Sequence, residues 1–243
     1  MLEARDLVVG YHEGVDILQG VSLRADEGAI TSIIGANGSG KSTMLRCLFG
    51  LLPARLGEVK FLEATVNDWT TERRKRAGIA YLPQHHSTFP QLTVHENLVL
   101  GGWLLRNDGV QLRARIESLY QLFPALASRR NVRATNLSGG QLRMLALAKE
   151  LVVLPKLLLV DEPSVGMAPN VAGELYAFLE RLPAEGVTVL LVDQNIVDAV
   201  RLAAHVYLLG QGRVQREGSG AWFAAHLDQV VGEMLRGPAE PDT

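Results

Sequence analysis

Short apolar runs rich in β-branched residues alternate along this chain with segments whose apolar residues recur at helical spacing. The strand-like runs cover residues 2–9, 20–24, 29–34, 57–66, 78–82, 157–160, 187–192, 206–209 and 213–217. The helix-like segments cover residues 42–51, 94–128, 140–154, 171–182 and 196–204. This alternation predicts a three-layer α/β core with a mainly parallel sheet.

The stretch from residue 86 to residue 152 differs from the rest because it has no clear strand. We therefore expect a helical insertion in the α/β core. Residues 237–243 contain two prolines among polar and acidic residues, and we expect this tail to be frayed.

Composition narrows the class of protein. The chain has 243 residues, and its 47% hydrophobic and 21% charged content is that of a globular domain. A net charge of −2 argues against a nucleic-acid binder, and the single cysteine, Cys47, excludes an internal disulfide or a multi-cysteine metal site. We expect Cys47 to be a small buried hydrophobe. No uninterrupted apolar stretch reaches about 18 residues and no secretory signal is present, so we expect a cytoplasmic protein.

Residues 35–43 read Gly-Ala-Asn-Gly-Ser-Gly-Lys-Ser-Thr and match the phosphate-binding loop pattern between a strand and a helix. Glycines let backbone N–H groups converge on phosphate oxygens, and the helix N-terminus adds a positive dipole end. Lys41 would contact the β- and γ-phosphates, Ser42 would offer its hydroxyl to Mg²⁺, and Thr43 would support the α-phosphate region. The alternative is a turn that only caps the helix. The candidate binding residues are Gly35, Asn37, Gly38, Ser39, Gly40, Lys41, Ser42 and Thr43.

Two carboxylates follow the apolar run 157–160. They would lie at the carboxyl end of a buried strand, where open α/β sheets bind ligands. Asp161 is suited to hold Mg²⁺, and Glu162 is placed to orient and deprotonate an attacking water. An exposed turn is the alternative.

A third motif, Leu137-Ser138-Gly139-Gly140-Gln141, precedes a predicted helix. Ser138 is a natural N-cap, so capping alone is one interpretation. The two glycines also permit a phosphate to approach the positive helix end. The phosphate loop, LSGGQ and LLLVDEP, in this order and spacing, together resemble an ATP-binding-cassette ATPase over essentially the whole chain.

The resemblance implies a P-loop NTPase core of the RecA-like type, with an N-terminal antiparallel β subdomain and an inserted helical subdomain. It divides a single domain, 1–243, into three parts. Residues 1–84 and 153–236 form the nucleotide-binding core with the β subdomain, 85–152 form the helical signature subdomain, and 237–243 form the tail.

Two such cassettes dimerise head to tail in this family, which implies that ATP lies between the phosphate loop of one chain and residues 138–141 of the other. Tyr11 lies where the family places an aromatic that stacks on adenine, and Gln84 matches the glutamine that reaches Mg²⁺. ATP and Mg²⁺ are the implied ligands.

Two positions depart from the commonest cassette pattern. Gln194 replaces the switch histidine, and an amide can hydrogen-bond the γ-phosphate or the lytic water but cannot carry a proton. Glu162 must then supply the base, and hydrolysis is expected to be slow or dependent on the partner. Ala168 stands where many cassettes have an aspartate.

Residues 164–169, the Gln194-Asn195 pair and residues 89–98 are similar to the ATP-binding subunits of branched-chain amino acid importers and of urea and amide importers. This implies a second cassette, identical or different, two membrane permeases and, indirectly, a periplasmic binding protein, at the cytoplasmic face of the inner membrane. Asp193, where the branch usually has Glu, and the C-terminal sequence depart from it. A lipid or lipopolysaccharide exporter, a cassette acting on nucleic acid or ribosomes, and a nucleotide sensor are the alternatives.

We expect no catalytic role for three other charged or apolar features. The basic run 73–76 is expected to be a solvated helix face, with a membrane or permease contact as the alternative. Arg143 and Lys149 are expected to be solvated or interface charges. Residues 98–105, with Trp103, are either core or the contact for a short helix of a membrane subunit.

Overall fold

A six-stranded sheet forms the centre of the computed structural model, which describes residues 1–85 and 87–236. The tail predicted to fray lies outside the described residues. The strands run in the order β10-β9-β3-β8-β7-β6, and every neighbouring pair is parallel except β9 and β10. Their bounds are β3 (Ile30–Ile34), β6 (Ile79–Leu82), β7 (Leu157–Asp161), β8 (Thr188–Val192), β9 (His205–Gly210) and β10 (Arg213–Ser219). The predicted mainly parallel sheet is confirmed.

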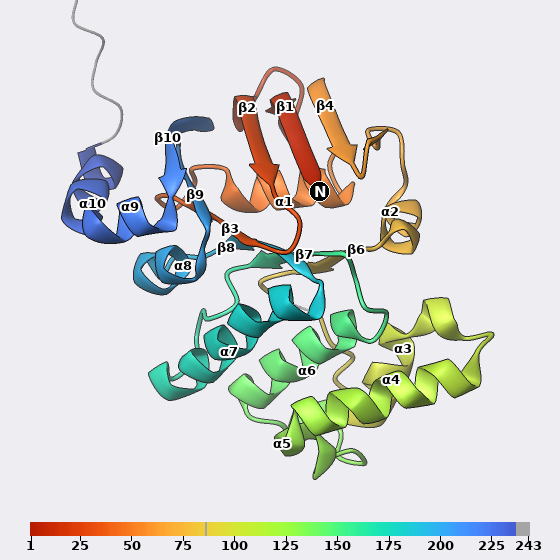
Figure 1. The fold of residues 1–243 in the computed structure, drawn as a ribbon. Coiled ribbons are helices and arrows are strands. Elements are labelled where there is room, and N and C mark those ends of the chain that lie inside the picture. Colours follow the sequence, from red (N-terminus) through yellow and green to blue (C-terminus); the bar gives the residue numbers. More distant parts are fainter. Residues whose placement is uncertain (86, 237–243) are drawn as a thin grey trace, which may run out of the picture.

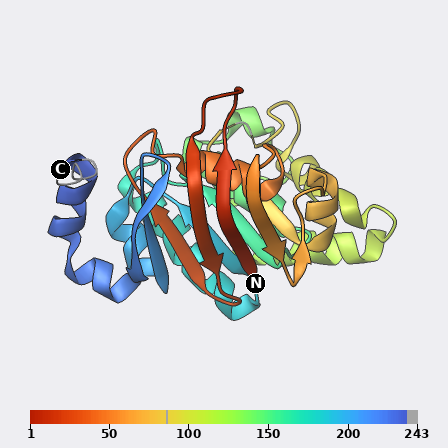
Figure 2. The ribbon, with the colours of Figure 1, turned by 90° about the horizontal axis from the view of Figure 1, so that it is seen from above.

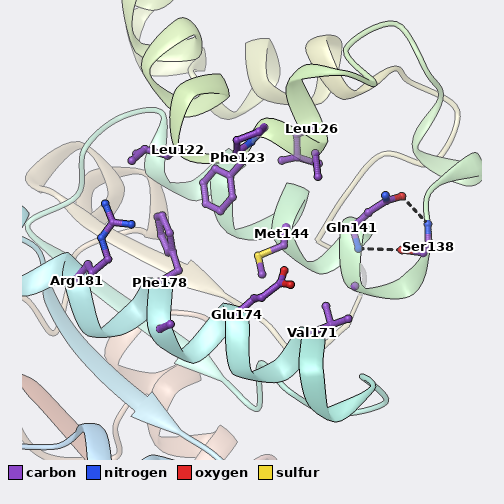
Figure 3. A pocket seen from close by; sticks show the side chains of 14 residues that line it. Leu122, Phe123, Leu126, Ser138, Gln141, Met144, Val171, Glu174, Phe178 and Arg181 are labelled. Atoms are coloured by element: carbon purple, nitrogen blue, oxygen red, sulfur yellow. Dashed lines mark hydrogen bonds between the residues drawn. The ribbon is translucent and has the colours of Figure 1, made fainter.

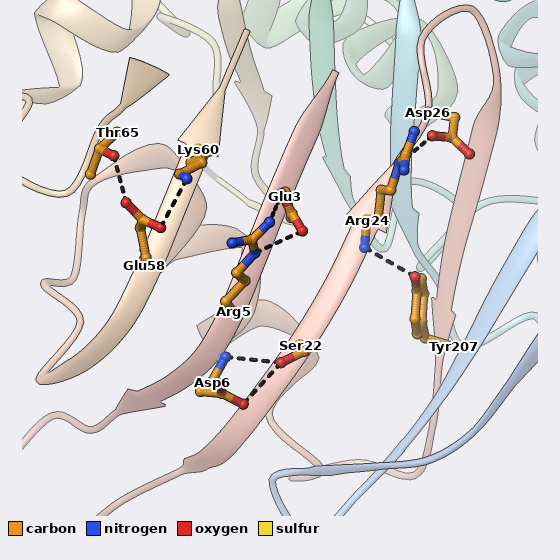
Figure 4. Close-up of polar contacts among 10 residues, drawn as sticks. All are labelled: Glu3, Arg5, Asp6, Ser22, Arg24, Asp26, Glu58, Lys60, Thr65 and Tyr207. Atoms are coloured by element: carbon orange, nitrogen blue, oxygen red, sulfur yellow. Dashed lines mark hydrogen bonds and ion pairs between the residues drawn. The ribbon is translucent and has the colours of Figure 1, made fainter. Parts of the chain in front are cut away.

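A second, antiparallel sheet lies above one face of the central sheet, with α1 (Lys41–Phe49) between them (Figure 1). Its order is β2-β1-β4-β5, with β1 (Leu2–Val9), β2 (Leu18–Ala25), β4 (Leu56–Phe61) and β5 (Ala64–Thr65). Figure 2 shows this sheet from its outer side. The outer face carries short polar contacts such as Arg5 to Glu3, and the backbone N–H of Arg24 donates to the Tyr207 hydroxyl on β9 at 3.0 Å (Figure 4).

Helices cover the opposite face of the central sheet (Figure 1). They are α6 (Gly139–Leu151), α7 (Pro169–Arg181) and α8 (Ile196–Leu202). Beyond α6 lie α3 (Val94–Gly101), α4 (Gly109–Leu122) and α5 (Pro124–Ala127). Alternate residues of β7 enter opposite cores, because Leu158 and Val160 pack with the helices and Leu157 and Leu159 pack with α1 and the antiparallel sheet. This explains the continuous apolar runs. Within the described ranges, no helix is long and apolar enough to cross a membrane.

The helical pattern over 94–128 is interrupted in the structure. It consists of α3 (Val94–Gly101), a 3₁₀ turn (Trp103–Leu105), α4 (Gly109–Leu122) and α5 (Pro124–Ala127). The side chain of Asp108 caps α4, and Pro124 begins α5. A Cβ on Gly101 would lie 2.4 Å from the Lys149 carbonyl oxygen, so α3 ends in close contact with α6. Two C-terminal helices, α9 (Gly220–Ala225) and α10 (Leu227–Arg236), were not predicted.

The structure corrects one expectation for the basic run, residues 73–76. It lies on α2 (Thr71–Ala77), and Arg74 is only 3% exposed, so the solvated face predicted for the run is wrong at this residue. Its guanidinium donates to five carbonyl oxygens, those of Cys47, Leu48, Val66, Asn67 and Trp69. Two of them belong to the last turn of α1, whose carbonyls have no partner within the helix. Cys47 is buried as expected, and burial raises the pKa of its thiol to about 11.

Candidate functional site

Four neighbouring parallel strands end at one edge of the central sheet, and each is followed by a residue with candidate chemistry. Residues 35–43 follow β3, Gln194 follows β8, Asp161 and Glu162 end β7, and Gln84 follows β6. The strand ends are level with one another, since Val192 on β8 lies opposite Ile33 on β3 and Asp161 on β7. The carboxyl edge of a parallel sheet is where α/β proteins bind ligands. The strand order therefore brings together side chains that are far apart in the sequence.

The phosphate loop borders a cavity of about 250 Å³ together with Tyr11 and Glu162. Gly38 and Gly40 have φ angles of 79° and 106°, in the left-handed region that favours glycine, and a Cβ on Gly40 would lie 2.7 Å from the Leu18 side chain. The first turn of α1 carries no acidic residue, so no carboxylate opposes the positive end of the helix. This arrangement suits an anion.

Ser39, Lys41 and Thr43 are the buried polar residues of this loop. Lys41 Nζ donates to the carbonyl oxygens of Gly35 and Ala36 at 2.9 and 3.1 Å. Burial lowers the pKa of Lys41, and the nearby carboxylates of Glu162 and Asp161 oppose that shift. The hydroxyl of Ser39 is buried and has no hydrogen-bond partner within the part of the chain that the structure describes.

Asp161 is buried, and both of its carboxylate oxygens accept hydrogen bonds. Ser42 Oγ donates to Oδ1 at 2.8 Å, and the Tyr81 hydroxyl donates to Oδ2 at 3.0 Å. Desolvation raises the pKa of Tyr81, which keeps that hydroxyl a donor at neutral pH. A serine hydroxyl and a carboxylate held together are the hard oxygen donors that Mg²⁺ prefers.

Glu162 is held in an unusual conformation. Its φ is 43°, in the left-handed region, and its backbone N–H donates to the Val192 carbonyl at 2.7 Å. Its Oε2 accepts from Gln84 Nε2 at 2.5 Å and from Gln194 Nε2 at 2.7 Å. Burial raises the pKa of Glu162, while the Gln194 hydrogen bond favours the ionised form. Two amides therefore aim one buried carboxylate, which suits a general base.

Asp193 is fully buried between the switch position and the loop after Pro163. It accepts from the Tyr176 hydroxyl at 2.7 Å, from Ser164 Oγ at 3.2 Å and from the Asn195 backbone at 3.0 Å. Desolvation raises its pKa, and these hydrogen bonds oppose the shift. In the sequence this residue stood out only as a departure from the importer pattern.

Arg143 is a functional candidate that sequence reasoning missed, and of the two expectations for it the solvated charge is wrong. Its three guanidinium nitrogens donate to four backbone carbonyls, those of Pro83, Gln84, Asp161 and Pro163. Desolvation lowers its pKa to about 10, so it remains a cation at neutral pH. A signal was available, because Arg143 lies four and eight residues before the buried Leu147 and Leu151, on the inner stripe of α6.

Lys149 also differs from a free surface charge. Its Nζ lies 3.2 Å from the buried carboxylate of Glu150, and it lies over the ring of Phe89 at 5.8 Å. It therefore helps to join α6 to the segment before α3.

Tyr11 lies beside the phosphate loop as expected. Its ring borders the same cavity and is 46% exposed, and its hydroxyl accepts from Arg46 Nη1 at 2.8 Å. An exposed ring at the rim of a phosphate-binding cavity is suited to stack on a planar base.

The signature residues 138–141 do not border that cavity. Ser138 is exposed and caps α6, and it forms a reciprocal capping box with Gln141 (Figure 3). Ser138, Gly140 and Gln141 border a separate cavity of about 510 Å³, whose apolar wall includes Phe123 and Phe178. The other candidate site residues therefore lie together around the phosphate loop. The signature tip, residues 138–141, lies elsewhere on the same chain.

Comparisons with known proteins find relatives that match most of this chain. Residues 18–165 match the family model described as "ABC transporter". The chain is 38% identical over 216 residues to a protein of Pseudomonas aeruginosa, the high-affinity branched-chain amino acid transport ATP-binding protein BraG, covering 89% of this chain and 92% of that one. It is 35% identical to the probable branched-chain amino acid transport ATP-binding protein LivF of Archaeoglobus fulgidus, covering 93% and 95%. It also resembles a dimeric ATP-binding cassette bound to ADP and Pi, with 28% identity, a TM-score of 0.81, and 90% and 98% coverage.

Proposed function

This chain belongs to the ABC transporter family and is an ATPase of that family, and on this premise we propose that it powers the import of branched-chain amino acids. The observation that carries the proposal is the convergence of the phosphate loop, Asp161, Glu162, Gln84 and Gln194 at one edge of the sheet. The names of the two relatives above favour branched-chain amino acids over the urea, amide and lipopolysaccharide alternatives.

In this proposal the hydrolytic step depends on charge neutralisation and positioning. The loop amides and Lys41 bind the β- and γ-phosphates. Glu162 accepts the proton of the attacking water, whose oxygen bonds to the γ-phosphorus as the bond to the ADP oxygen breaks. Gln84 and Gln194 hold the Glu162 carboxylate toward that water. Because Gln194 has no titratable proton, the base function falls on Glu162 alone.

The donor set at Asp161 fits Mg²⁺. Ser42, Asp161 and Gln84 would hold the ion, and the hydrogen bond from Ser42 to Asp161 already brings two oxygen donors together. A bound Mg²⁺ would neutralise phosphate charge. Tyr81, which donates to the other oxygen of Asp161, fixes the orientation of that carboxylate.

The second ATP-binding surface comes from another cassette, identical or different. The support is that Ser138 and Gly139 are exposed at the start of α6 and lie outside the cavity of the chain's own phosphate loop. A head-to-tail partner would place the amides at this helix start against the γ-phosphate.

A membrane subunit would dock in a groove between α1, α2 and α3. This groove, of about 510 Å³, is lined by Phe49, Lys75, Leu100, Trp103 and Leu104 among others. Trp103 is 59% exposed, which suits an anchor for a short amphipathic helix of a permease. Such docking would place the chain at the cytoplasmic face of the membrane, and a periplasmic binding protein would act through the permeases.

Steady-state hydrolysis tests the enzymatic part. Lys41→Ala should abolish tight nucleotide binding, because it removes the buried cation of the loop, and the exposed Lys156→Ala serves as the matched control. Retained micromolar affinity in Lys41→Ala would contradict the phosphate-loop assignment.

The transport part needs the complex with its membrane subunits in proteoliposomes. With the cognate binding protein, leucine, isoleucine or valine should stimulate hydrolysis and be taken up, and urea should not. Stimulation by urea or by lipopolysaccharide alone would overturn the substrate class and leave the ATPase assignment intact.

A further inference from the structure

We propose that Arg143 is a positioning residue, which holds the backbone on both sides of Glu162 and links it to the signature tip of the same chain. The inference rests on the proposed role of Glu162 as the base. It assigns Arg143 a task in hydrolysis although its side chain does not border the phosphate-loop cavity.

The first observation concerns the backbone of Glu162. A left-handed φ of 43° is disfavoured for a residue with a side chain, so neighbouring contacts must maintain it. Arg143 Nη2 donates to the carbonyl before it, Asp161 O, at 2.9 Å, and Nε donates to the carbonyl after it, Pro163 O, at 3.0 Å. With the bond from Glu162 N–H to Val192, the peptide groups around the base are fixed from two sides.

The second observation concerns Gln84. Arg143 Nη1 donates to the carbonyls of Pro83 and Gln84, at 2.5 and 3.2 Å. The side chain of Gln84 in turn donates to the Glu162 carboxylate. One planar guanidinium therefore fixes both the base and one of the amides that aim it, a geometry that a lysine ammonium cannot reproduce.

The third observation is where Arg143 lies on its helix. It is two residues beyond Gln141, whose side chain closes the capping box on Ser138. The tip packs closely on α7, because a Cβ on Gly140 would lie 2.4 Å from Val171 Cγ1. A shift of the tip would therefore move the guanidinium relative to Glu162. In a head-to-tail dimer the tip contacts the neighbour's nucleotide, so Arg143 would transmit that contact to the chain's own base.

The test compares kcat with ATP affinity in the full chain. In Arg143→Met we expect kcat to fall at least about tenfold, with the Kd for a fluorescent ATP analogue unchanged within about twofold, since no loop contact is removed. Arg143→Lys should be intermediate. Arg74→Met is the matched control, because it removes another guanidinium that binds only backbone carbonyls; it should lower the melting temperature and keep kcat per folded molecule.

An Arg143→Met chain with wild-type kcat would overturn the inference. So would a parallel loss of kcat and affinity like that of a merely unstable chain. If Arg143→Met does not fold, Arg143→Gln provides the same comparison with fewer donors. A wild-type chain that binds ATP without hydrolysing it would overturn the proposed function and this inference together, whereas an active wild type with an unaffected Arg143→Met overturns the inference alone.

Discussion

At the scale of single residues, the candidate chemistry converges on one carboxylate. Glu162 is buried, is aimed by two amides and has the left-handed backbone that presents its side chain to the phosphate loop. The amides of Gln84 and Gln194 stabilise this geometry but cannot accept a proton at neutral pH, so they cannot replace Glu162 as a base. Substitutions here should therefore separate binding from hydrolysis.

Glu162→Gln should keep ATP binding and lower kcat by a factor on the order of 10²–10³, because the amide fills the same space but cannot accept a proton. Closed dimers should accumulate with ATP, measured by size-exclusion chromatography. Glu185→Gln, an exposed position in the 3₁₀ turn after α7, is the control. Unchanged steady-state hydrolysis in Glu162→Gln would remove its role as the base.

The pH dependence follows from the raised pKa of Glu162. A base must be deprotonated, so kcat should fall as the pH drops through that pKa, at a higher pH than for an ordinary glutamate. Gln194→Leu removes a hydrogen bond that favours the ionised form and should move this acid limb to still higher pH. A pH–rate profile at saturating Mg-ATP measures the acid limb of the wild type and of Gln194→Leu. Identical acid limbs in these two proteins would contradict the proposed effect of Gln194 on Glu162.

At the scale of elements, contacts between segments rely on guanidinium groups that bind backbone carbonyls as well as on apolar packing. Arg74 joins the last turn of α1 to α2 and to the segment before it through five carbonyls. Buried carbonyls left without donors are costly, which makes Arg74 a structural counterpart of Arg143.

Arg74→Met should lower the free energy of unfolding by about 2–4 kcal/mol, because the hydrogen bonds from its guanidinium to five carbonyl oxygens are lost. Arg76→Met, on the exposed side of the same helix and paired only with Glu72, should change it by less than about 0.5 kcal/mol. Urea denaturation of the two variants measures the difference. Equal effects would show that burial of Arg74 contributes little.

The sequence predicted the elements that alternate cleanly and the motifs that follow them. The nine strand-like runs and the phosphate loop lie where the apolar pattern indicated. It could not predict that Arg74 is buried, because its partners are carbonyls from distant segments and carbonyls leave no mark in a sequence. For Arg143 the helical spacing to Leu147 and Leu151 indicated the inner side of α6, but not the carbonyls that it binds. The C-terminal helices were missed although Leu227, Val230 and Met234 recur at helical spacing, and Phe223 and Val230 are buried by tertiary contacts.

At the scale of the whole molecule, the candidate ATP-binding surfaces are divided between two places on the chain. The phosphate-loop cavity and the signature tip share no lining residue. The groove that would receive a membrane subunit is a third site, between α1, α2 and α3. Completing an ATP site therefore needs a second cassette, and coupling to transport needs a membrane subunit.

Mixing two inactive variants tests whether one ATP site is built from the phosphate loop of one chain and the signature tip of another. Lys41→Ala lacks a working phosphate loop, and Ser138→Arg should block the signature tip. If identical chains dimerise head to tail, a mixture should regain part of the hydrolysis that neither variant shows alone, because one intact site forms in each mixed dimer. A mixture as inactive as its components, while a wild-type mixture is active, would contradict the head-to-tail arrangement.

Trp103→Asp tests the groove. It should prevent co-purification with the membrane subunits, because it places a charge where an apolar helix would pack, and ATP binding to the isolated chain checks that the variant folds. Val110→Asp is the control, since Val110 is 72% exposed on α4 and does not line the groove. Equal recovery of the complex with both variants would exclude Trp103 as an anchor.

The burial of Cys47 beneath Arg74 has a practical consequence. It is the only thiol in the sequence, and its raised pKa and inaccessible sulfur leave it almost inert toward maleimides. A cysteine introduced at the exposed Val165 would then be the single position labelled with a fluorophore, in an otherwise native background. Opening and closing of the paired chains could be followed by energy transfer in real time.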